Sequence, residues 1–252
     1  MRRSRLARWL PVLMGGGAAP FVDPSSISGL LLWCAADQLT GLNDGDAVAS
    51  FTDLSGNDNH PVCANAANQP SFKTNILNSL PALLFSGDLD ANGDWLRVGF
   101  AHPQPCMMFF IFKLLTMRVE SLVIGNYLNA INIKAGTSSV NAIKAMAGTE
   151  DLYYRNSGVD EFAIWTVEFN GAASKIYKAG ALVSTANAGT NAGDGVTIGA
   201  SSSFALYGPG SSRELGNAHM YLAELIIYNK VLSAGERNNV GEFLSEKYGL
   251  NF

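Results

Sequence analysis

Residues 220–250 read MYLAELIIYNKVLSAGERNNVGEFLSEKYGL, a strand pattern followed by a capped-helix pattern. The run Met220–Tyr228 is apolar except for Glu224 and has the length of a strand, so it predicts a buried strand. Ser233 and Glu236 have the Ser-x-x-Glu spacing, in which each side chain accepts a hydrogen bond from the other residue's backbone N–H. This spacing predicts that a helix begins at Ser233.

The predicted helix has one apolar face. A single arc of a helix with 3.6 residues per turn contains Val240, Phe243, Leu244 and Tyr248. Gly249 can adopt the left-handed conformation that commonly ends a helix. We therefore expect this helix to pack its apolar face on the rest of the domain.

Most other apolar runs have the length of strands. Met107–Phe112 is apolar on both alternating faces, which is typical of a central strand covered on both sides. In Glu161–Phe169 one alternating set is fully apolar and should face the core: Ala163, Trp165, Val167 and Phe169. Further strands are expected at Leu30–Ala35, Ala47–Asp53, Ala82–Ser86, Trp95–Val98, Ser121–Gly125, Ala130–Lys134, Leu152–Arg155 and Gly195–Gly199. Many short strands with one helix indicate an all-β sandwich or jelly roll.

Composition agrees with this fold class. Charged residues make up only 15% of the 252 residues, against about 25% in a typical globular protein, while 26 glycines separate the apolar runs. The formal net charge is −4, which gives no basic footprint, so we expect no nucleic-acid partner. The three cysteines, Cys34, Cys63 and Cys106, are an odd number, which argues against a disulfide scaffold.

Several blocks of the sequence resemble one family. They are DGDAVASFTDLSGNDNH (44–60) with LPALLFSG (80–87), SKIYKAGALVST (174–185), and AELIIYNKVLSAGERNNVGEFLSEKYGL (223–250). In this order they resemble laminin-G-like, concanavalin A-like lectin and glucanase domains of bacterial and phage origin, over about residues 28 to 250. The resemblance implies an antiparallel two-sheet concanavalin A-like jelly roll with one C-terminal helix. We place this domain at residues 28–252.

The N-terminal segment differs from the rest of the chain. It begins with a basic run followed by a short apolar stretch, including Arg2, Arg3, Arg5, Arg8, Trp9 and Leu10. By composition it resembles a signal peptide, but Pro11 interrupts an apolar stretch that is already short. We interpret residues 1–27 as an extended assembly arm whose arginines face acidic groups on a neighbouring subunit. No segment reaches the length of a membrane-spanning helix.

Catalytic carboxylates are not evident in the sequence. Glucanases of this fold commonly present Glu-x-Asp-x-Glu on one strand face, because acid and nucleophile must flank the same glycosidic bond. That motif is absent, and the adjacent pairs Glu150-Asp151 and Asp160-Glu161 would point to opposite faces of an extended strand. We therefore expect a protein without catalytic activity. Carboxylates brought together from distant strands remain the alternative.

An oxygen-rich segment suggests a metal site. Asp88, Asp90 and Asn92 are followed by Gly93 and Asp94, like the first half of a calcium loop. The twelfth position is Gly99 and not a glutamate, so a complete EF-hand is excluded. The segment is either a calcium loop completed by other residues or a polar hairpin tip. A second such turn, at Asp53, is interpreted as an ordinary turn.

Exposed aromatic residues beside polar groups are the candidates for glycan binding. Tyr153, Tyr154 and Arg155 lie next to a turn-rich stretch, as does Tyr207. Because neighbouring residues of a strand point to opposite faces, one of Tyr153 and Tyr154 should point into the core.

These features favour a structural and recognition module. We expect a virion decoration or fibre protein of a phage or phage-like particle, homo-oligomeric, joined to other virion subunits through its arm, and binding host polysaccharide. The alternatives are an exported bacterial carbohydrate-binding protein at the cell surface or outside the cell and, third, a glycosidase. A purely structural decoration protein without glycan binding fits the sequence almost as well.

Overall fold

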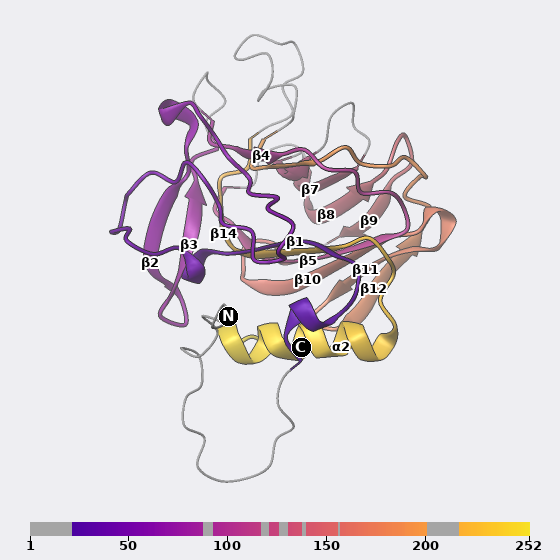
Figure 1. Cartoon of the computed structure of the whole chain (residues 1–252). Helices are drawn as coiled ribbons and strands as arrows, with labels where there is room; N and C mark the ends of the chain where they lie inside the picture. Colours follow the sequence, from indigo (N-terminus) through magenta and orange to yellow (C-terminus); the bar gives the residue numbers. More distant parts are fainter. Residues whose placement is uncertain are drawn as a thin grey trace.

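The computed structural model describes residues 22–87, 93–116, 121–125, 131–137, 140–155, 157–200 and 217–252. In these residues two antiparallel sheets face each other and one helix covers the outer side of the first sheet (Figure 1). This is the predicted all-β sandwich with a C-terminal helix.

The first sheet has eight strands among the described residues, in the order β12-β11-β10-β5-β14-β3-β2, with β1 also paired to β14. Their bounds are β1 Leu30–Ala35, β2 Ser71–Leu77, β3 Leu80–Phe85, β5 Cys106–Leu114, β10 Ala163–Phe169, β11 Ser174–Lys178, β12 Ala181–Ala186 and β14 Met220–Tyr228. The second sheet has six, in the order β4-β13-β6-β7-β8-β9. Their bounds are β4 Leu96–Val98, β6 Ser121–Gly125, β7 Asn132–Thr137, β8 Val140–Met146, β9 Leu152–Arg155 and β13 Val196–Ile198.

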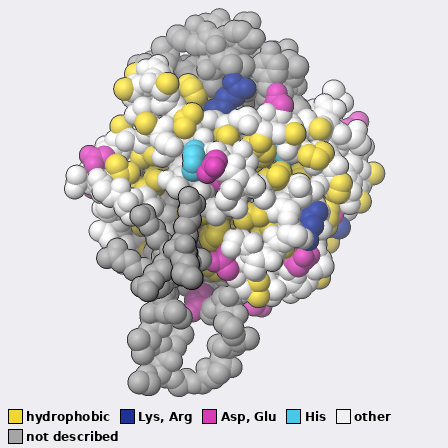
Figure 2. Space-filling view, viewed as in Figure 1, with side chains coloured by type: hydrophobic (Ala, Val, Ile, Leu, Met, Phe, Trp, Pro, Cys, Tyr) yellow, Lys and Arg dark blue, Asp and Glu magenta, His cyan; other side chains and the backbone are white. Residues whose placement is uncertain are grey.

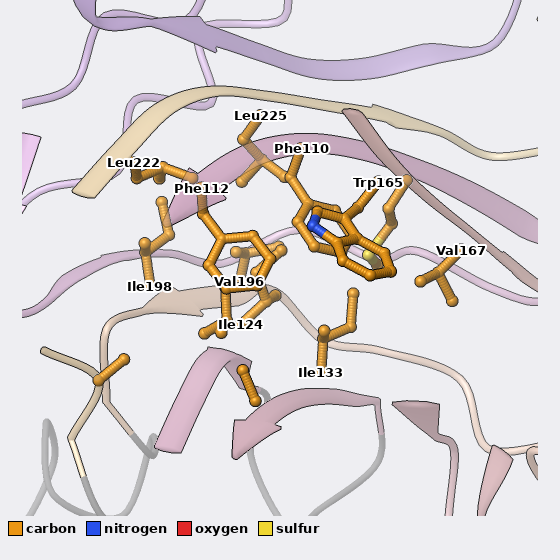
Figure 3. Packing of buried hydrophobic residues seen from close by; sticks show 14 of the residues in the cluster. Phe110, Phe112, Ile124, Ile133, Trp165, Val167, Val196, Ile198, Leu222 and Leu225 are labelled. Carbon is orange, nitrogen blue, oxygen red and sulfur yellow. The ribbon is translucent and has the colours of Figure 1, made fainter. Parts of the chain in front are cut away.

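The strand β5 lies between β10 and β14 and is covered on both sides, as its two apolar faces predict. Phe110 and Phe112 point into the core between the sheets, where they meet Trp165 of β10 (Figure 3). Ile124 and Ile133 of the second sheet close this core from the other side. The alternate residues of β5 belong to a second core beneath the helix: Met107, Phe109 and Ile111.

The helix α2, Ala234–Tyr248, has the predicted caps. Ser233 Oγ accepts a hydrogen bond from Glu236 N–H at 3.2 Å, and Glu236 Oε2 accepts one from Ser233 N–H at 2.8 Å. Gly249 ends the helix with φ of 63°. Val240, Leu244 and Tyr248 of the predicted apolar face are buried in the second core.

Phe243 is the exception on that face, because it is only partly buried at the edge of the second core. Its ring meets the Trp33 ring edge-on, with centroids 5.9 Å apart. Phe243 therefore contributes less apolar burial than the pattern of the helix alone implies.

Three strand assignments differ from the expectation. Residues 47–53, expected as a strand, pair only through isolated bridges: Ala47 with Ser71, Ser50 with Val62, and Asp53 with Cys34. The strands β2 and β8 were not expected, because SFKTNIL and VNAIKAM have too much polar or small-residue content for a clear alternating pattern. Their pairing comes from neighbouring strands and not from local preference.

The predicted central hairpin is formed by β11 and β12, which pair antiparallel. Ala179 and Gly180 make its two-residue turn with φ values of 47° and 74°. Positive φ at both positions is the geometry that matches the twist of a hairpin. Alanine pays a conformational penalty there that glycine or asparagine largely avoids.

Part of the segment expected to be an arm packs on the domain. Ile27 is buried in the second core, and Tyr228 Oη donates a hydrogen bond of 2.9 Å to Pro24 O. The folded domain therefore includes residues from Val22 onward and not only from 28. The residues that carry the arm prediction, Arg2 to Leu10, lie outside the described residues.

A buried ionic network joins the helix to the first sheet. Lys247 Nζ lies 2.6 Å from Glu224 Oε2 of β14 and 2.8 Å from Asp37 Oδ1. Glu224 also accepts hydrogen bonds from Trp33 Nε1 at 2.6 Å and from Tyr248 Oη at 2.8 Å. Glu224, the polar residue in the apolar run of β14, thus accepts hydrogen bonds from residues of β1 and α2 and joins both elements to β14.

Candidate functional site

The predicted glycan-binding residues of 153–155 lie on β9, an edge strand of the second sheet that runs beside β11 and β12 (Figure 1). Tyr154 turns inward and packs on the main core, with its ring centroid 6.4 Å from that of Trp165. Tyr153 and Arg155 therefore lie on the outer face of the sheet. Tyr207 lies outside the described residues.

Tyr153 has two cationic neighbours. Lys144 Nζ is 5.1 Å and Arg155 Cζ is 5.8 Å from the centre of its ring. Lys144 also forms an ion pair of 2.8 Å with Asp151. Burial alone would lower the pKa of Lys144, but hydrogen bonds and charge interactions with Asp151 and Tyr153 outweigh it and raise that pKa, so the ammonium stays charged at neutral pH.

A hollow of about 260 Å³ opens at the end of the sandwich, beside the turn that joins β8 to β9. Its lining consists of hydroxyl, amide, glycine and alanine groups with one carboxylate: Ala147, Gly148, Thr149, Glu150, Asn187, Gly189, Thr190 and Asn191. Thr149, Glu150, Asn187, Thr190 and Asn191 are exposed to solvent. Such side chains can exchange hydrogen bonds with a polyhydroxylated ligand.

The loop that forms one wall of the hollow is held by Gln104. Gln104 Nε2 donates to Gly189 O at 3.1 Å and to Asn191 O at 2.9 Å, and its Oε1 accepts from Gly171 N–H at 2.9 Å. The backbone N–H of Ala147 donates to Ala188 O, which joins the two walls. The hollow is therefore fixed before any ligand arrives.

No sequence pattern predicted this hollow. Its available signal was the stretch NAGTNAGDG, 187–195, in which asparagines and glycines alternate with small residues. That composition also fits an ordinary loop. Only the packing of this loop against residues 147–150 makes the two segments one surface.

The predicted calcium ligands are mostly outside the described residues: Asp88, Asp90 and Asn92. Asp94 is described and buried, and its Oδ2 accepts a hydrogen bond of 2.7 Å from Ser86 N–H. The described residues contain no group of three or more His, Cys, Asp or Glu that could hold a metal ion. Asp94 has a backbone partner already, so calcium at 88–94 stays a prediction.

The turn at Asp53 is structural, as interpreted from the sequence. Asp53 Oδ1 accepts hydrogen bonds from Trp33 N–H at 3.0 Å and Ser55 N–H at 2.9 Å. Its Oδ2 accepts from Asn59 N–H at 2.9 Å. These bonds fix the turn against β1.

The acidic residues of the two adjacent pairs, and Glu168 of β10, do not converge on one site in the described part of the chain. Glu168 is buried and pairs with Lys175 at 3.2 Å, whereas Glu161 is exposed. Asp160 accepts a hydrogen bond from Asn141 Nδ2 at 2.8 Å. Among the described residues that line the hollow, Glu150 is the one carboxylate, and glycoside hydrolysis generally uses two.

The cysteines do not offer a nucleophile. All three are free and buried, with no disulfide between them. Burial raises the pKa of the Cys106 thiol to about 12 and raises the pKa values of Cys34 and Cys63 as well. A thiol with a raised pKa is unreactive at neutral pH.

Comparison with known proteins gives a likeness of fold. No protein-family model matches the sequence, and no characterised protein matches it by sequence. Solved structures do match. The binding domain of botulinum neurotoxin serotype D/C superposes with a TM-score of 0.57 at 14% identity, over 91% of this chain and 56% of that one.

A second similar structure is the sialidase of Trypanosoma rangeli in complex with sialic acid, with a TM-score of 0.53 at 12% identity. It is matched over 88% of this chain but only 33% of the sialidase. The botulinum neurotoxin DC binding domain was also solved with SialylT, at a TM-score of 0.53 and 13% identity over 88% of this chain and 52% of that one. This chain thus spans about a third to a half of these proteins, and the likeness concerns the β-sandwich alone.

Lys and Arg side chains are scattered on the face shown in Figure 2 and do not gather in a basic patch there. In the described part of the chain, no helix is long and apolar enough to cross a membrane.

Proposed function

We propose that this protein is a carbohydrate-binding module without catalytic activity. The observation that carries the proposal is the preformed hollow at the β8–β9 turn, lined by amide, hydroxyl and carboxylate groups, with Tyr153 three residues beyond the lining residue Glu150 on the same segment. Sugars need hydrogen-bonding groups for their hydroxyls and an aromatic ring for their apolar face. Solved structures of similar fold that contain sialic acid or SialylT support this reading.

The absence of catalysis is part of the proposal. Glu150 is the single carboxylate that the described part of the chain contributes to the lining of the hollow, and it is exposed to solvent. Neither a buried partner acid nor a reactive thiol lies among the residues that line it. One exposed carboxylate is suited to accepting hydrogen bonds from sugar hydroxyls and does not supply the acid and base that hydrolysis requires.

A glycan array followed by calorimetry tests the proposal. We expect the wild-type protein to bind at least one oligosaccharide, and Asn191→Ala to weaken binding by about 1 kcal/mol, the contribution of one hydrogen bond. Tyr153→Ala should weaken it by about 1 to 2 kcal/mol. Asn238→Ala, which changes an exposed asparagine on α2, is the matched control and should have no effect. Binding that neither Asn191→Ala nor Tyr153→Ala weakens would refute this location of the binding site.

We further propose that the module belongs to a phage or phage-like particle and joins other virion subunits, as a homo-oligomer, through its arginine-rich N-terminal segment. The support is the basic and apolar composition of residues 1–21, which is unlike that of the domain. Deleting residues 1–21 should leave the melting temperature of the domain unchanged and prevent incorporation into particles. Normal incorporation would contradict the particle role, and secretion of a processed chain would favour an exported bacterial lectin.

A further inference from the structure

The outer face of the second sheet carries a row of cations. Lys134 of β7 lies directly opposite Lys144 of β8, which lies directly opposite Tyr153 of β9. Arg155 follows two residues after Tyr153 on the same face.

Two acidic residues near this face are held by described partners, and neither is paired with Arg155. Asp151 pairs with Lys144 at 2.8 Å. Asp160 is held by Asn141 at 2.8 Å. Among the ion pairs of the described residues, none involves Arg155.

Arg155 is the accessible member of the row. Its residue is exposed, whereas the side chain of Lys144 is only 8% exposed. Its guanidinium lies 5.8 Å from the centre of the Tyr153 ring, within the range of a cation–π contact. An arginine held against an aromatic ring keeps its planar set of N–H donors ready for two parallel hydrogen bonds to a carboxylate or sulfate.

The ion pair of Lys144 and Asp151 lies beside Tyr153 and positions its ring next to Arg155. Lys144 Nζ lies 5.1 Å from the centre of the Tyr153 ring and forms its ion pair with Asp151 at the start of β9. Ser184 Oγ of β12 donates a hydrogen bond of 2.6 Å to Tyr153 O, which fixes the backbone of this edge strand. Tyr153 is thus held through its ring by Lys144 and through its backbone by Ser184, and Arg155 is exposed to solvent.

From this geometry we infer that the saccharide bound beside Tyr153 carries an anionic group, a carboxylate or a sulfate ester, and that Arg155 holds this group. The inference rests on the proposed carbohydrate binding and names the ligand class. Glu150 and Arg155 are five residues apart, about 16 Å along an extended strand. The neutral part of the ligand therefore occupies the hollow near Glu150, and the acidic group lies at the Arg155 end.

This charge distribution favours an oligosaccharide with a single acidic group over a polyanion. A polyanion would place further negative charges against Glu150, which lines the hollow, in a protein with a net charge of −4. A nucleic acid or heparin is consequently a poor fit to the same surface.

Matched pairs of ligands test the inference by calorimetry in low salt: sialyllactose against lactose, a glucuronic-acid oligosaccharide against its carboxyl-reduced form, and sulfated lactose against lactose. We expect the acidic member of at least one pair to bind about tenfold more tightly, the effect of one charge-assisted contact. The pairs separate a carboxylate from a sulfate preference. Added salt should reduce the difference.

Three variants test whether Arg155 causes the preference for acidic ligands. Arg155→Gln should abolish the preference for the acidic ligand, whereas Arg155→Lys should keep part of it. Lys73→Gln, which removes a cation from β2 of the other sheet, is the control and should keep the full preference. Melting temperatures measured alongside show whether each variant is folded.

The outcomes for this inference and for the proposed function differ. Equal affinity of the wild type for acidic and neutral ligands overturns the inference, and neutral binding that Asn191→Ala weakens would leave the proposed function standing. A preference that survives Arg155→Gln overturns the role of Arg155. Absence of binding to any saccharide overturns both, as does stronger binding to heparin or DNA than to every oligosaccharide.

Discussion

Replacing Lys247 by methionine should destabilise the domain strongly. Lys247 is the cation between Glu224 and Asp37, whose side chains are each 1% exposed. The substitution keeps an unbranched apolar stem and removes only the charge, so two buried carboxylates are left without their counter-ion. Removing one partner of a buried ion pair costs about 3–5 kcal/mol, and we expect the upper part of this range because both acids lose the same partner.

Urea unfolding at neutral pH, followed by tryptophan fluorescence, measures this loss. Trp33 reports on the site directly because its Nε1 donates to Glu224 Oε1 at 2.6 Å. A loss of about 4 kcal/mol corresponds to a fall in melting temperature of about 8–16 °C for a domain of this size. Adding Glu224→Gln and Asp37→Asn to Lys247→Met should recover part of the stability, since the unpaired charges are then gone.

The control is Lys230→Met, the same change in another lysine close to the helix. Lys230 pairs with Glu236 at 2.8 Å, but both side chains are about one-third exposed, so water compensates for its loss. We expect the control to remain close to the wild type. If Lys247→Met proved no more destabilising than Lys230→Met, the network would not hold the helix to the sheet and the reasoning from burial would be wrong.

Three further predictions concern the same domain. Leu244→Ala should cost about 2–5 kcal/mol because Leu244 of the helix is buried in the second core. Phe243→Ala should cost less, although phenylalanine is larger, because Phe243 is only partly buried. Denaturant unfolding that shows the reverse order would contradict this. Stability should fall as pH rises above about 10. Burial raises the pKa of Tyr248, whereas the charges of Glu224 and Asp37 outweigh burial and raise the pKa of Lys247. A group whose pKa is raised in the folded state stabilises below its unfolded pKa and loses this contribution as pH rises, which melting curves at several pH values can measure. If Asp88, Asp90 and Asn92 bind calcium, EDTA should lower the melting temperature and Asp90→Ala should remove that sensitivity; an unchanged melting curve with chelator would leave a polar hairpin tip.

Residues 220–250 specified their own structure because each signal in them is local. The capping pair Ser233 and Glu236 lies within one helical turn, and Gly249 ends the helix through its own backbone conformation. The run Met220–Tyr228 is apolar enough to be buried in any β-protein. The same holds for Met107–Phe112, where two apolar faces predicted a central strand, and for the inward face of β10.

The sequence also limited the candidate site. Alternation along a strand required that Tyr153 and Tyr154 point to opposite faces, and the structure shows that Tyr154 is the core residue. Which of the two faces was buried could not be read locally, because both residues are tyrosine. It depends on the register of β9 with β8, in which Tyr154 lies opposite the buried Ile143.

Tertiary structure alone decided the features that combine distant segments. Strand β2 has a weak pattern and is a strand because β3 pairs with it, whereas residues 47–53 had the better pattern and found only isolated bridges. The hollow brings residues 147–150 against 187–191, and the ionic network joins Asp37, Glu224 and Lys247. Local sequence encodes backbone preference and the apolar period, whereas contacts between residues far apart in the chain depend on how the two sheets and the helix pack, which no short segment contains.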